Sequence, residues 1–211
     1  GGSGDSTIAV IKKYENRISK WISEPDRGIY DAMNKGIRLA KGEVIAILNS
    51  DDLYADDRVI EDLVKLFSAD SDLDIVYGDL IYVKRDDIYK PVRKWYSRDF
   101  YPNFFEHGHV PPHPALFLRK RVYDEAGLFN LTFSLAADYE FMLRIFKKFH
   151  FKSKHVKRII TKMRLGGATN KNFKNIIRGN KEILESWRVN GLKASVTLMP
   201  LRVIKRINQF F

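Results

Sequence analysis

The sequence contains no cysteine, no low-complexity block and no apolar run of membrane-spanning length. Without cysteine, neither a disulfide framework nor a thiolate metal site is available. A membrane-spanning helix needs about 20 predominantly apolar residues, and no such run occurs. The first residues also lack the apolar core of a secretory signal. We therefore expect a folded cytoplasmic protein, either free or peripheral on the inner face of the membrane.

Acidic residues are fewer than basic ones: 26 Asp+Glu against 37 Lys+Arg give a formal net charge of +11. Such an excess implies an anionic partner, which could be nucleotide phosphates, nucleic acid or an anionic bilayer. The acidic residues gather in the first two thirds of the chain, whereas the segment from Lys147 onward is mostly basic. We therefore expect the anion-facing surface to be C-terminal.

Strand and helix patterns alternate in the first part of the chain, which predicts an α/β protein with a mostly parallel sheet flanked by helices. Polar residues then interleave with apolar ones from residue 80 to 92, which predicts a smaller antiparallel extension. The length of 211 residues suits one such domain with a helical appendage. The expected strands include 18–22, 44–48, 75–79 and 159–165, and the expected helices begin near Ile29, Val59, Ala137 and Phe173.

A charged motif follows the apolar strand at 44–48. Ligands collect at the carboxyl ends of strands in open α/β sheets, which is where Asn49, Ser50, Asp51 and Asp52 fall. Two adjacent carboxylates repel each other, and Mn²⁺ or Mg²⁺, bound by both and by substrate phosphates, would relieve that repulsion. The alternative is that the two aspartates cap the next helix. The spacing alone leaves both interpretations open.

Four ordered motifs resemble those of the family 2 glycosyltransferases that build bacterial polysaccharides. They are EPDRGIYDAMNKG at 24–36, KGE at 41–43, LNSDD at 48–52 and AADYE at 136–140. The resemblance implies the glycosyltransferase A-type fold, in which a Rossmann-like nucleotide-binding half joins an acceptor-binding half. It also implies an inverting, metal-dependent transfer of a hexosyl group from a nucleotide-diphosphate sugar to a saccharide or lipid-linked acceptor.

The resemblance also assigns roles to the carboxylates. Asn49, Ser50 and Asp51 occupy the Asp-x-Asp position of the family, so Asp51 and Asp52 are expected to hold the metal. Asn49, Ser50 and Asp52 are expected to contact the donor, although Asn49 replaces the usual aspartate. Asp138 matches the catalytic base, which must lie beside the acceptor hydroxyl and take its proton. A role as helix N-cap or first-turn residue is the alternative for Asp138, and Ala137 stands where a glutamate usually precedes the base.

The resemblance places Asp26 and Arg27 in a turn that borders the nucleotide, with Asn34 on the following helix supporting it. The chain begins at the glycine-rich turn of the family, without the preceding strand-helix-strand unit of roughly 30 residues. We therefore expect an N-terminally incomplete catalytic domain over 1–170, with reduced base recognition and doubtful activity. Its nucleotide side covers about 1–80 and its acceptor side about 81–170, and a basic amphipathic helical extension covers 171–211.

Two other interpretations compete with a transferase. His107, His109 and His113 could hold a metal, but no cysteine accompanies them, and His113 before a strand is more typical of a packing or acceptor-site residue. The positive charge suggests a non-catalytic module that binds nucleic acid or another anion. The basic residues form no recognised nucleic-acid motif, so we do not expect nucleic acid as a partner.

The last 19 residues predict an amphipathic helix. Apolar residues recur there at spacings of three and four, with Lys and Arg between them. This composition is typical of a helix that lies on an anionic membrane surface. The alternative is that the helix packs back on the domain.

Overall fold

The structure is a computed structural model that describes residues 1–166 and 173–210. Its helices are α1 (Thr7–Lys13), α2 (Ile29–Leu39), α3 (Val59–Ala69), α4 (Lys120–Ala126), α5 (Ala137–Leu143), α6 (Phe173–Val189) and α7 (Leu198–Ile207). Its strands are β1 (Val44–Ala46), β2 (Leu53–Tyr54), β3 (Ile75–Val83), β4 (Pro91–Trp95), β5 (Leu116–Arg119) and β6 (Ser153–Arg164). Short helical turns are η1 (Glu15–Arg17), η2 (His113–Ala115), the π-helical η3 (Arg144–Lys148) and η5 (Asn208–Phe210).

The six strands form one sheet in the order β1-β5-β3-β6-β2, with β4 paired to β3. β5 pairs with the start of β3 and β4 with its end. The expected α/β class is confirmed, but the pairing corrects the expectation of a mostly parallel sheet. Of the pairs among described strands only β3–β6 is parallel, because β5 runs antiparallel to both β1 and β3. The apolar runs that suggested parallel strands are instead strands of a mixed sheet covered on both faces.

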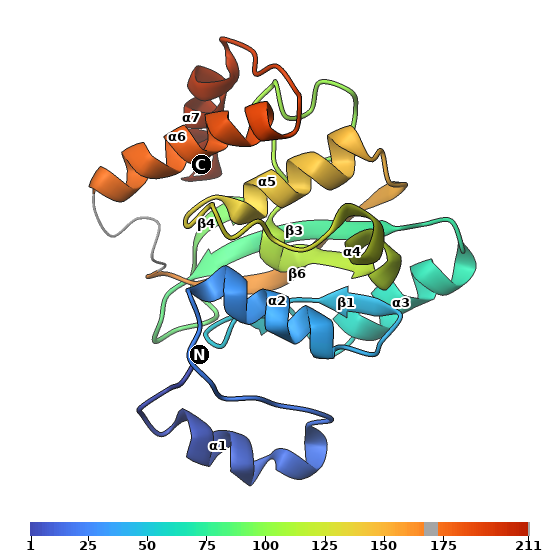
Figure 1. The fold of residues 1–211 in the computed structure, drawn as a ribbon, viewed down its shortest axis with the longest axis vertical. Coiled ribbons are helices and arrows are strands. Elements are labelled where there is room, and N and C mark those ends of the chain that lie inside the picture. Colours follow the sequence, from blue (N-terminus) through green and yellow to red (C-terminus); the bar gives the residue numbers. More distant parts are fainter. Residues whose placement is uncertain (167–172, 211) are drawn as a thin grey trace.

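Helices cover both faces of this sheet. Side chains alternate between the faces along a strand, so Tyr77 and Val76 belong to different apolar clusters. Tyr77 packs in the larger cluster with residues of α2, α4, α5 and α6, whereas Val76 packs against α3. Figure 1 shows α6 alongside α5 on the first of these faces. The larger cluster therefore joins the C-terminal helices to the sheet.

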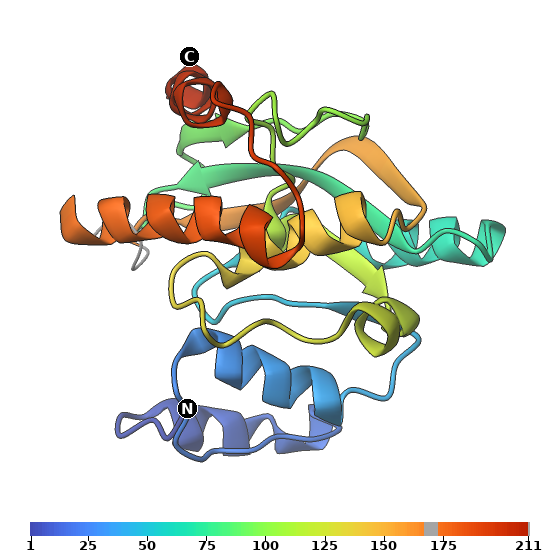
Figure 2. The same ribbon diagram turned by 45° about the horizontal axis from the view of Figure 1, so that its top comes forward.

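The N-terminal segment lies outside this core. Figures 1 and 2 both show α1 apart from the sheet, and none of its residues is buried. The expected strand at 18–22 is wrong, because this segment makes no strand pairing and runs along the outer side of α2. The mixed sheet described above therefore has β1 at one edge.

The C-terminal helices pack on the domain. α6 spans Phe173–Val189, as the sequence predicts, and its Trp187 is buried. Leu198 of α7 is also fully buried, and a Cβ at Gly108 (φ +77°) would lie 2.7 Å from the backbone nitrogen of Arg202. The side of α7 that carries Leu198 therefore packs back on the domain, as the alternative interpretation of the tail predicts. The predicted domain boundary at 170/171 lies outside the described residues.

Candidate functional site

A tight turn follows β1 and carries the predicted metal motif. The backbone nitrogen of Asp52 donates to the Asn49 carbonyl at 3.0 Å, and the Asn49 amide donates to Oδ2 of Asp52 at 2.9 Å. Ser50 is exposed at the tip of the turn. The next helix begins only at Val59, with Arg58 at its N-cap. The alternative interpretation of the two aspartates as helix caps is therefore wrong.

The structure gives the two neighbouring aspartates different environments. Asp51 is half-buried, whereas Asp52 is 5% exposed, and its Oδ1 has no hydrogen-bond partner among the described residues. Burial raises the pKa of Asp52, and the charge of Asp51 raises it further. Arg164 of β6 donates to the Asp51 carbonyl at 2.7 Å and brings one cation to the turn. An unpartnered buried carboxylate oxygen next to a second carboxylate fits a bound divalent cation.

Protein ligands alone do not complete such a cation site. No group of three or more His, Asp or Glu side chains in the described part of the chain is placed to hold a metal. Mg²⁺ and Mn²⁺ commonly take one or two carboxylates and fill their remaining positions with water and substrate phosphates. Asp51 and Asp52 therefore fit a metal that is completed by a phosphate-bearing ligand.

We expect Asp52→Asn to stabilise the ligand-free protein at neutral pH. The pKa of Asp52 is higher in the folded than in the unfolded state, so ionisation costs the folded protein stability as the pH rises through the folded-state value. The uncharged amide removes that cost. We therefore expect a higher Tm at pH 7, and each kcal/mol of stability corresponds to about 2–4 °C in a domain of this size. The gain should vanish near pH 4, because the unfolded-state pKa is about 3.9.

Thermal melts between pH 4 and pH 8 test this expectation, with the exposed Asp57→Asn as the matched control. A Tm difference that is the same at every pH, or a loss of stability at pH 7, would contradict it.

Asp138 lies in the first turn of α5, where two hydrogen bonds fix its carboxylate. Its Oδ1 accepts from the Tyr30 hydroxyl at 3.0 Å and from the Tyr139 backbone nitrogen at 2.8 Å. Burial raises the pKa of Tyr30, with a further contribution from the charge of Asp138, so the phenol keeps its proton and donates. Among described residues no hydrogen bond reaches Oδ2. Ala136, not Asp138, is the N-cap, and Asp138 lies in the first turn of α5, as the other half of the alternative interpretation allows.

The loop that leads into α5 is held from two sides. Glu182 of α6 accepts hydrogen bonds from the backbone nitrogens of Ser134, Leu135 and Ala136 at 2.8–3.1 Å. Burial alone would raise the pKa of Glu182, but these hydrogen bonds hold it below its usual value. Asn34 of α2 is buried and exchanges two hydrogen bonds with the Phe129 backbone, at 2.9 and 3.0 Å. α2 and α6 thus fix the position of Asp138 through its loop.

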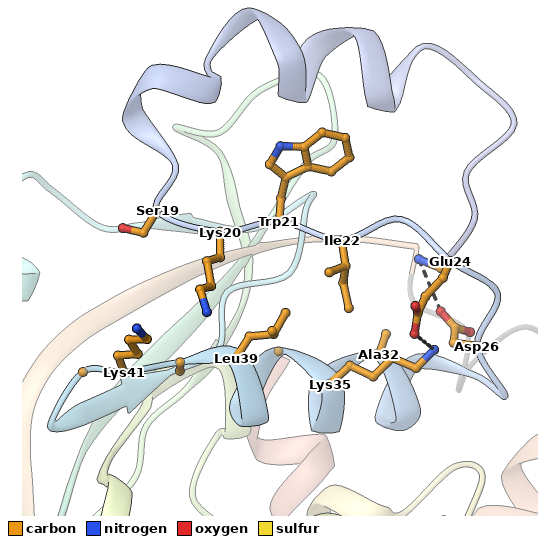
Figure 3. A pocket seen from close by; sticks show the side chains of 14 residues that line it. Ser19, Lys20, Trp21, Ile22, Glu24, Asp26, Ala32, Lys35, Leu39 and Lys41 are labelled. Atoms are coloured by element: carbon orange, nitrogen blue, oxygen red, sulfur yellow. Dashed lines mark ion pairs between the residues drawn. The ribbon is translucent and has the colours of Figure 1, made fainter.

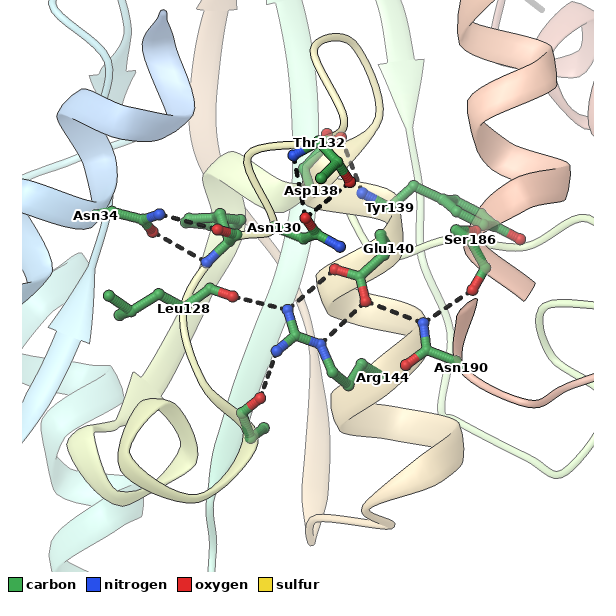
Figure 4. A network of polar contacts seen from close by, with 12 residues as sticks. Asn34, Leu128, Asn130, Thr132, Asp138, Tyr139, Glu140, Arg144, Ser186 and Asn190 are labelled. Atoms are coloured by element: carbon green, nitrogen blue, oxygen red, sulfur yellow. Dashed lines mark hydrogen bonds and ion pairs between the residues drawn. The ribbon is translucent and has the colours of Figure 1, made fainter. Parts of the chain in front are cut away.

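A buried ion pair fixes α5 from below Asp138 (Figure 4). Arg144 and Glu140 pair at 3.0 Å with side chains 13% and 3% exposed, and Arg144 also donates to the Leu128 carbonyl at 2.8 Å. Asn190, which follows α6, donates to Glu140 at 2.9 Å. Removing one partner would leave a buried charge uncompensated, so this network sets the orientation of the helix.

The charges of Asp52 and Asp138 both act on the phenol of Tyr82 on β3. Burial raises the pKa of Tyr82, the charges of Asp52 and Asp138 raise it further, and Arg93 and Arg206 oppose them. Both carboxylates therefore lie within electrostatic range of one phenol. His113 is buried beside Asp138 and Phe129, and burial lowers its pKa although Asp138 opposes the shift, so it is neutral at pH 7.

The predicted nucleotide-turn residues lie elsewhere. Asp26 accepts from the Gly28 nitrogen at 3.0 Å, and the Arg27 side chain is 77% exposed and 3.5 Å from Asp31. Asp26 lines a cavity of about 770 Å³ between segment 19–24 and the outer side of α2, which Figure 3 shows. Asp51, Asp52 and Asp138 do not line this cavity. His107 and His109 both lie beside Tyr101, and His107 is hydrogen-bonded to the Tyr101 hydroxyl at 3.0 Å. Together with His113 they form no group placed to hold a metal in the described part of the chain.

Comparison with known proteins identifies the family. The family model described as glycosyl transferase family 2 matches residues 1–127. The chain belongs to this family. An uncharacterized glycosyltransferase of Mycobacterium tuberculosis is 33% identical over 147 residues, which cover 68% of this chain and 54% of that protein. A PGL/p-HBAD biosynthesis glycosyltransferase of Mycobacterium bovis is 27% identical over 149 residues, or 69% of this chain and 56% of the relative. The chain thus spans about half the length of these curated relatives.

Solved structures confirm the glycosyltransferase A-type fold. TarS of Staphylococcus aureus, solved as residues 1–349 in complex with UDP, has a TM-score of 0.63 at 14% identity. The likeness covers 94% of this chain and 56% of that one. The mannosyltransferase PcManGT of Pyrobaculum calidifontis, in complex with GDP-Man and Mn²⁺, has a TM-score of 0.60 at 18% identity, over 97% of this chain and 57% of that one.

The sequence analysis missed three residues that shape this site. Tyr30 lies inside the first quoted motif, where its phenol could have suggested a partner for a carboxylate. Glu182 and Arg164 carry no local signal, because they reach the site from α6 and β6. Only the fold brings them to the predicted aspartates.

Proposed function

We propose that this chain transfers a sugar with inversion from a nucleotide-diphosphate donor to a saccharide or lipid-linked acceptor. The observation that carries the proposal is the pair of carboxylate sites around Tyr82. Among the described residues no hydrogen bond reaches the second oxygen of Asp138, and the buried Oδ1 of Asp52 has no partner, while the charges of both carboxylates act on Tyr82. Inverting transfer needs one carboxylate at the acceptor and a charge-compensated place for the leaving diphosphate.

In this mechanism Asp138 is the general base. The acceptor hydroxyl attacks the anomeric carbon from the face opposite the diphosphate and gives its proton to Oδ2 of Asp138. Tyr30 holds Oδ1 and keeps the other oxygen directed at the acceptor. The neutral His113 beside the base does not compete for its charge as an ion-pair partner. Asn34 and Glu182 limit the movement of the base by fixing its loop, which supports catalysis through positioning.

Asp51 and Asp52 would hold Mn²⁺ or Mg²⁺, with the donor phosphates completing its coordination. When bound, such a cation neutralises negative charge that develops on the leaving diphosphate. Asn49 keeps Asp52 in place through its amide hydrogen bond, and Ser50 is exposed next to both carboxylates. Asp26 and Arg27 are proposed to border the nucleotide at the start of α2.

A nucleotide-release assay with the 211-residue chain tests the proposed function. UDP- and GDP-sugars are each incubated with Mn²⁺, with Mg²⁺ and with a chelator. We expect slow release of the nucleoside diphosphate from at least one donor, in keeping with the reduced base recognition expected from the sequence, and loss of that release with the chelator. No release from any donor, or release that the chelator leaves unchanged, would contradict the proposal.

We also propose that α7 places the enzyme on an anionic membrane surface, near a lipid-linked acceptor. Val203, Ile204 and Ile207 are 50–56% exposed along one side of α7, opposite the buried Leu198. Arg206 on the same helix is exposed, as is Lys193 in the segment before it. No helix within residues 1–166 or 173–210 is long and apolar enough to cross a bilayer. An apolar stripe with exposed cations nearby suits a helix lying in the interface of an anionic bilayer.

Replacing both Val203 and Ile207 by Asp should lower co-sedimentation with phosphatidylserine-containing liposomes roughly 10-fold or more. The two changes remove apolar side chains from the exposed stripe and add negative charge, while Leu198 continues to anchor the helix. The matched control replaces Ile60 and Val64, which are similarly exposed and four residues apart on α3. Equal pelleting of the two double variants would rule the stripe out.

A further inference from the structure

His113 is a buried histidine whose ring has no hydrogen-bond partner in the described part of the chain. It begins the turn η2 and is 9% exposed. The turn itself is fixed on the sheet, because the Thr161 hydroxyl of β6 donates to the Pro114 carbonyl at 2.8 Å. No hydrogen bond from a described residue reaches either ring nitrogen of His113. A buried polar ring is normally paired, so a ligand is the natural partner to look for.

The ring of His113 lies beside the proposed base. It packs edge-on against Phe129 with ring centroids 5.5 Å apart, and the Tyr30 ring packs against the same phenylalanine at 5.7 Å. The Tyr30 hydroxyl in turn donates to Asp138 at 3.0 Å. Phe129 is 3% exposed, and Asn34 holds its backbone through two hydrogen bonds. The imidazole and the carboxylate are therefore fixed around one buried aromatic side chain.

The ring nitrogens of His113 are not sealed inside the core. The fold encloses Nδ1 of His155 without a partner, but within the described residues it encloses neither nitrogen of His113 in this way. The nitrogens therefore border accessible space, although the residue as a whole is buried.

The chemistry of this ring matches a hydroxyl group. Burial lowers the pKa of His113, so the ring is neutral at pH 7 and carries one N–H donor and one nitrogen that accepts. A hydroxyl both donates and accepts, so it can pair with either nitrogen. Water can fill this place in the free protein, and a substrate hydroxyl can replace it because it makes the same hydrogen bonds.

We propose that His113 hydrogen-bonds a hydroxyl group of the acceptor next to the hydroxyl that attacks the donor. The proposal rests on the proposed function in taking Asp138 as the base that receives the proton of the attacking hydroxyl. With one hydroxyl at Asp138 and its neighbour at the imidazole, the reacting end of the acceptor is a vicinal diol. The second hydrogen bond aligns the attacking oxygen, and a site built for a hydroxyl discriminates against an acceptor that lacks it.

The acceptor, not the donor, is assigned to His113 because of what surrounds the ring. The aromatic contacts through Phe129 and Tyr30 lead to Asp138. Among the described carboxylates Asp138 alone acts on the charge of His113.

Competition between two isomeric diols tests the proposal. Propylene glycol has adjacent hydroxyls, whereas its isomer trimethylene glycol has them one carbon further apart. Both are added in equal amounts to the parent chain with a nucleotide-sugar donor, and proton NMR measures the two glycosides formed. We expect the propylene glycol product to form about 10-fold faster, which is the effect of one hydrogen bond.

Three variants show whether His113 is the source of this preference. His113→Phe keeps a flat ring without nitrogens and should bring the product ratio close to one. His113→Gln keeps a donor and an acceptor and should restore part of the preference. The matched control is His107→Phe, an exposed histidine, which should keep the parental ratio. Thermal melts check that each variant is folded, and the ratio given by the parent chain does not depend on them.

A titration without turnover separates this proposal from the proposed function. The parent chain, labelled with nitrogen-15 in its histidines, is titrated with each glycol, and the ring signals of His113 are assigned from their loss in His113→Phe. We expect propylene glycol to shift these signals and trimethylene glycol to shift them much less. If no donor is cleaved, the proposed function fails, and this titration still decides the role of His113.

The contradicting results are distinct. Equal shifts by the two glycols, or no shift of the His113 signals, would overturn the proposal. So would a product ratio near one from the parent chain, donor hydrolysis without either glycoside, or the parental ratio in His113→Phe. Shifts produced by UDP- or GDP-sugars and not by the glycols would assign His113 to the donor and overturn it as well.

Discussion

Asp138→Asn should lower sugar transfer by roughly 100-fold or more while donor affinity changes little. A general base acts in the transition state and contributes little to ground-state binding of the donor, so its loss appears in kcat. The amide keeps the shape of the side chain and can still accept the Tyr30 hydrogen bond, but it cannot take a proton. Steady-state nucleotide release measures kcat, and calorimetry measures donor affinity.

The exposed Asp124→Asn on α4 is the matched control for this change, and it should behave as the parent. A parental turnover rate in Asp138→Asn would show that Asp138 is only a first-turn residue of α5. A comparable loss of donor affinity would show that its role is binding.

Asp51→Asn should remove metal-dependent nucleotide binding and leave the fold intact. The half-buried Asp51 is the more open of the two carboxylates, so its charge is available to a cation shared with the donor phosphates. Losing a charged ligand should cost about 3 kcal/mol, or roughly 100-fold in Kd. Titration with UDP and GDP, with and without Mn²⁺, measures the effect. Asp57→Asn is the control, and equal affinities with and without metal in the parent would contradict the assignment.

The sequence was sufficient for the local features of this protein. The apolar run before Asn49 predicts β1 and the turn that holds Asp51 and Asp52. The helical spacing of apolar residues in the segment before Val189 predicts α6. Both features depend on neighbouring residues only. The α/β class is predicted in the same way, because strand and helix patterns alternate along the sequence.

Features that depend on distant residues were not predictable. An apolar run such as that of β5 is compatible with parallel or antiparallel pairing, so the direction of β5 beside β1 and β3 could not be read from it. Tyr30 meets Asp138 across 108 residues of sequence. The amphipathic pattern of the C-terminal tail does not tell which of its apolar residues pack on the domain. The structure shows that Leu198 faces the core and that Ile207 is exposed.

The central claim is that Asp138 activates an acceptor for direct attack opposite the diphosphate. Proton NMR of donor hydrolysis by the 211-residue chain tests it without knowledge of the acceptor, because water can take the acceptor's place. The measurement follows donors with an α-linked sugar and records which anomer of the free sugar forms first, before mutarotation. The account predicts the β-anomer first from the parent chain and at least 100-fold slower release from Asp138→Asn. An α-anomer formed first, or equal rates for the two proteins, would contradict it.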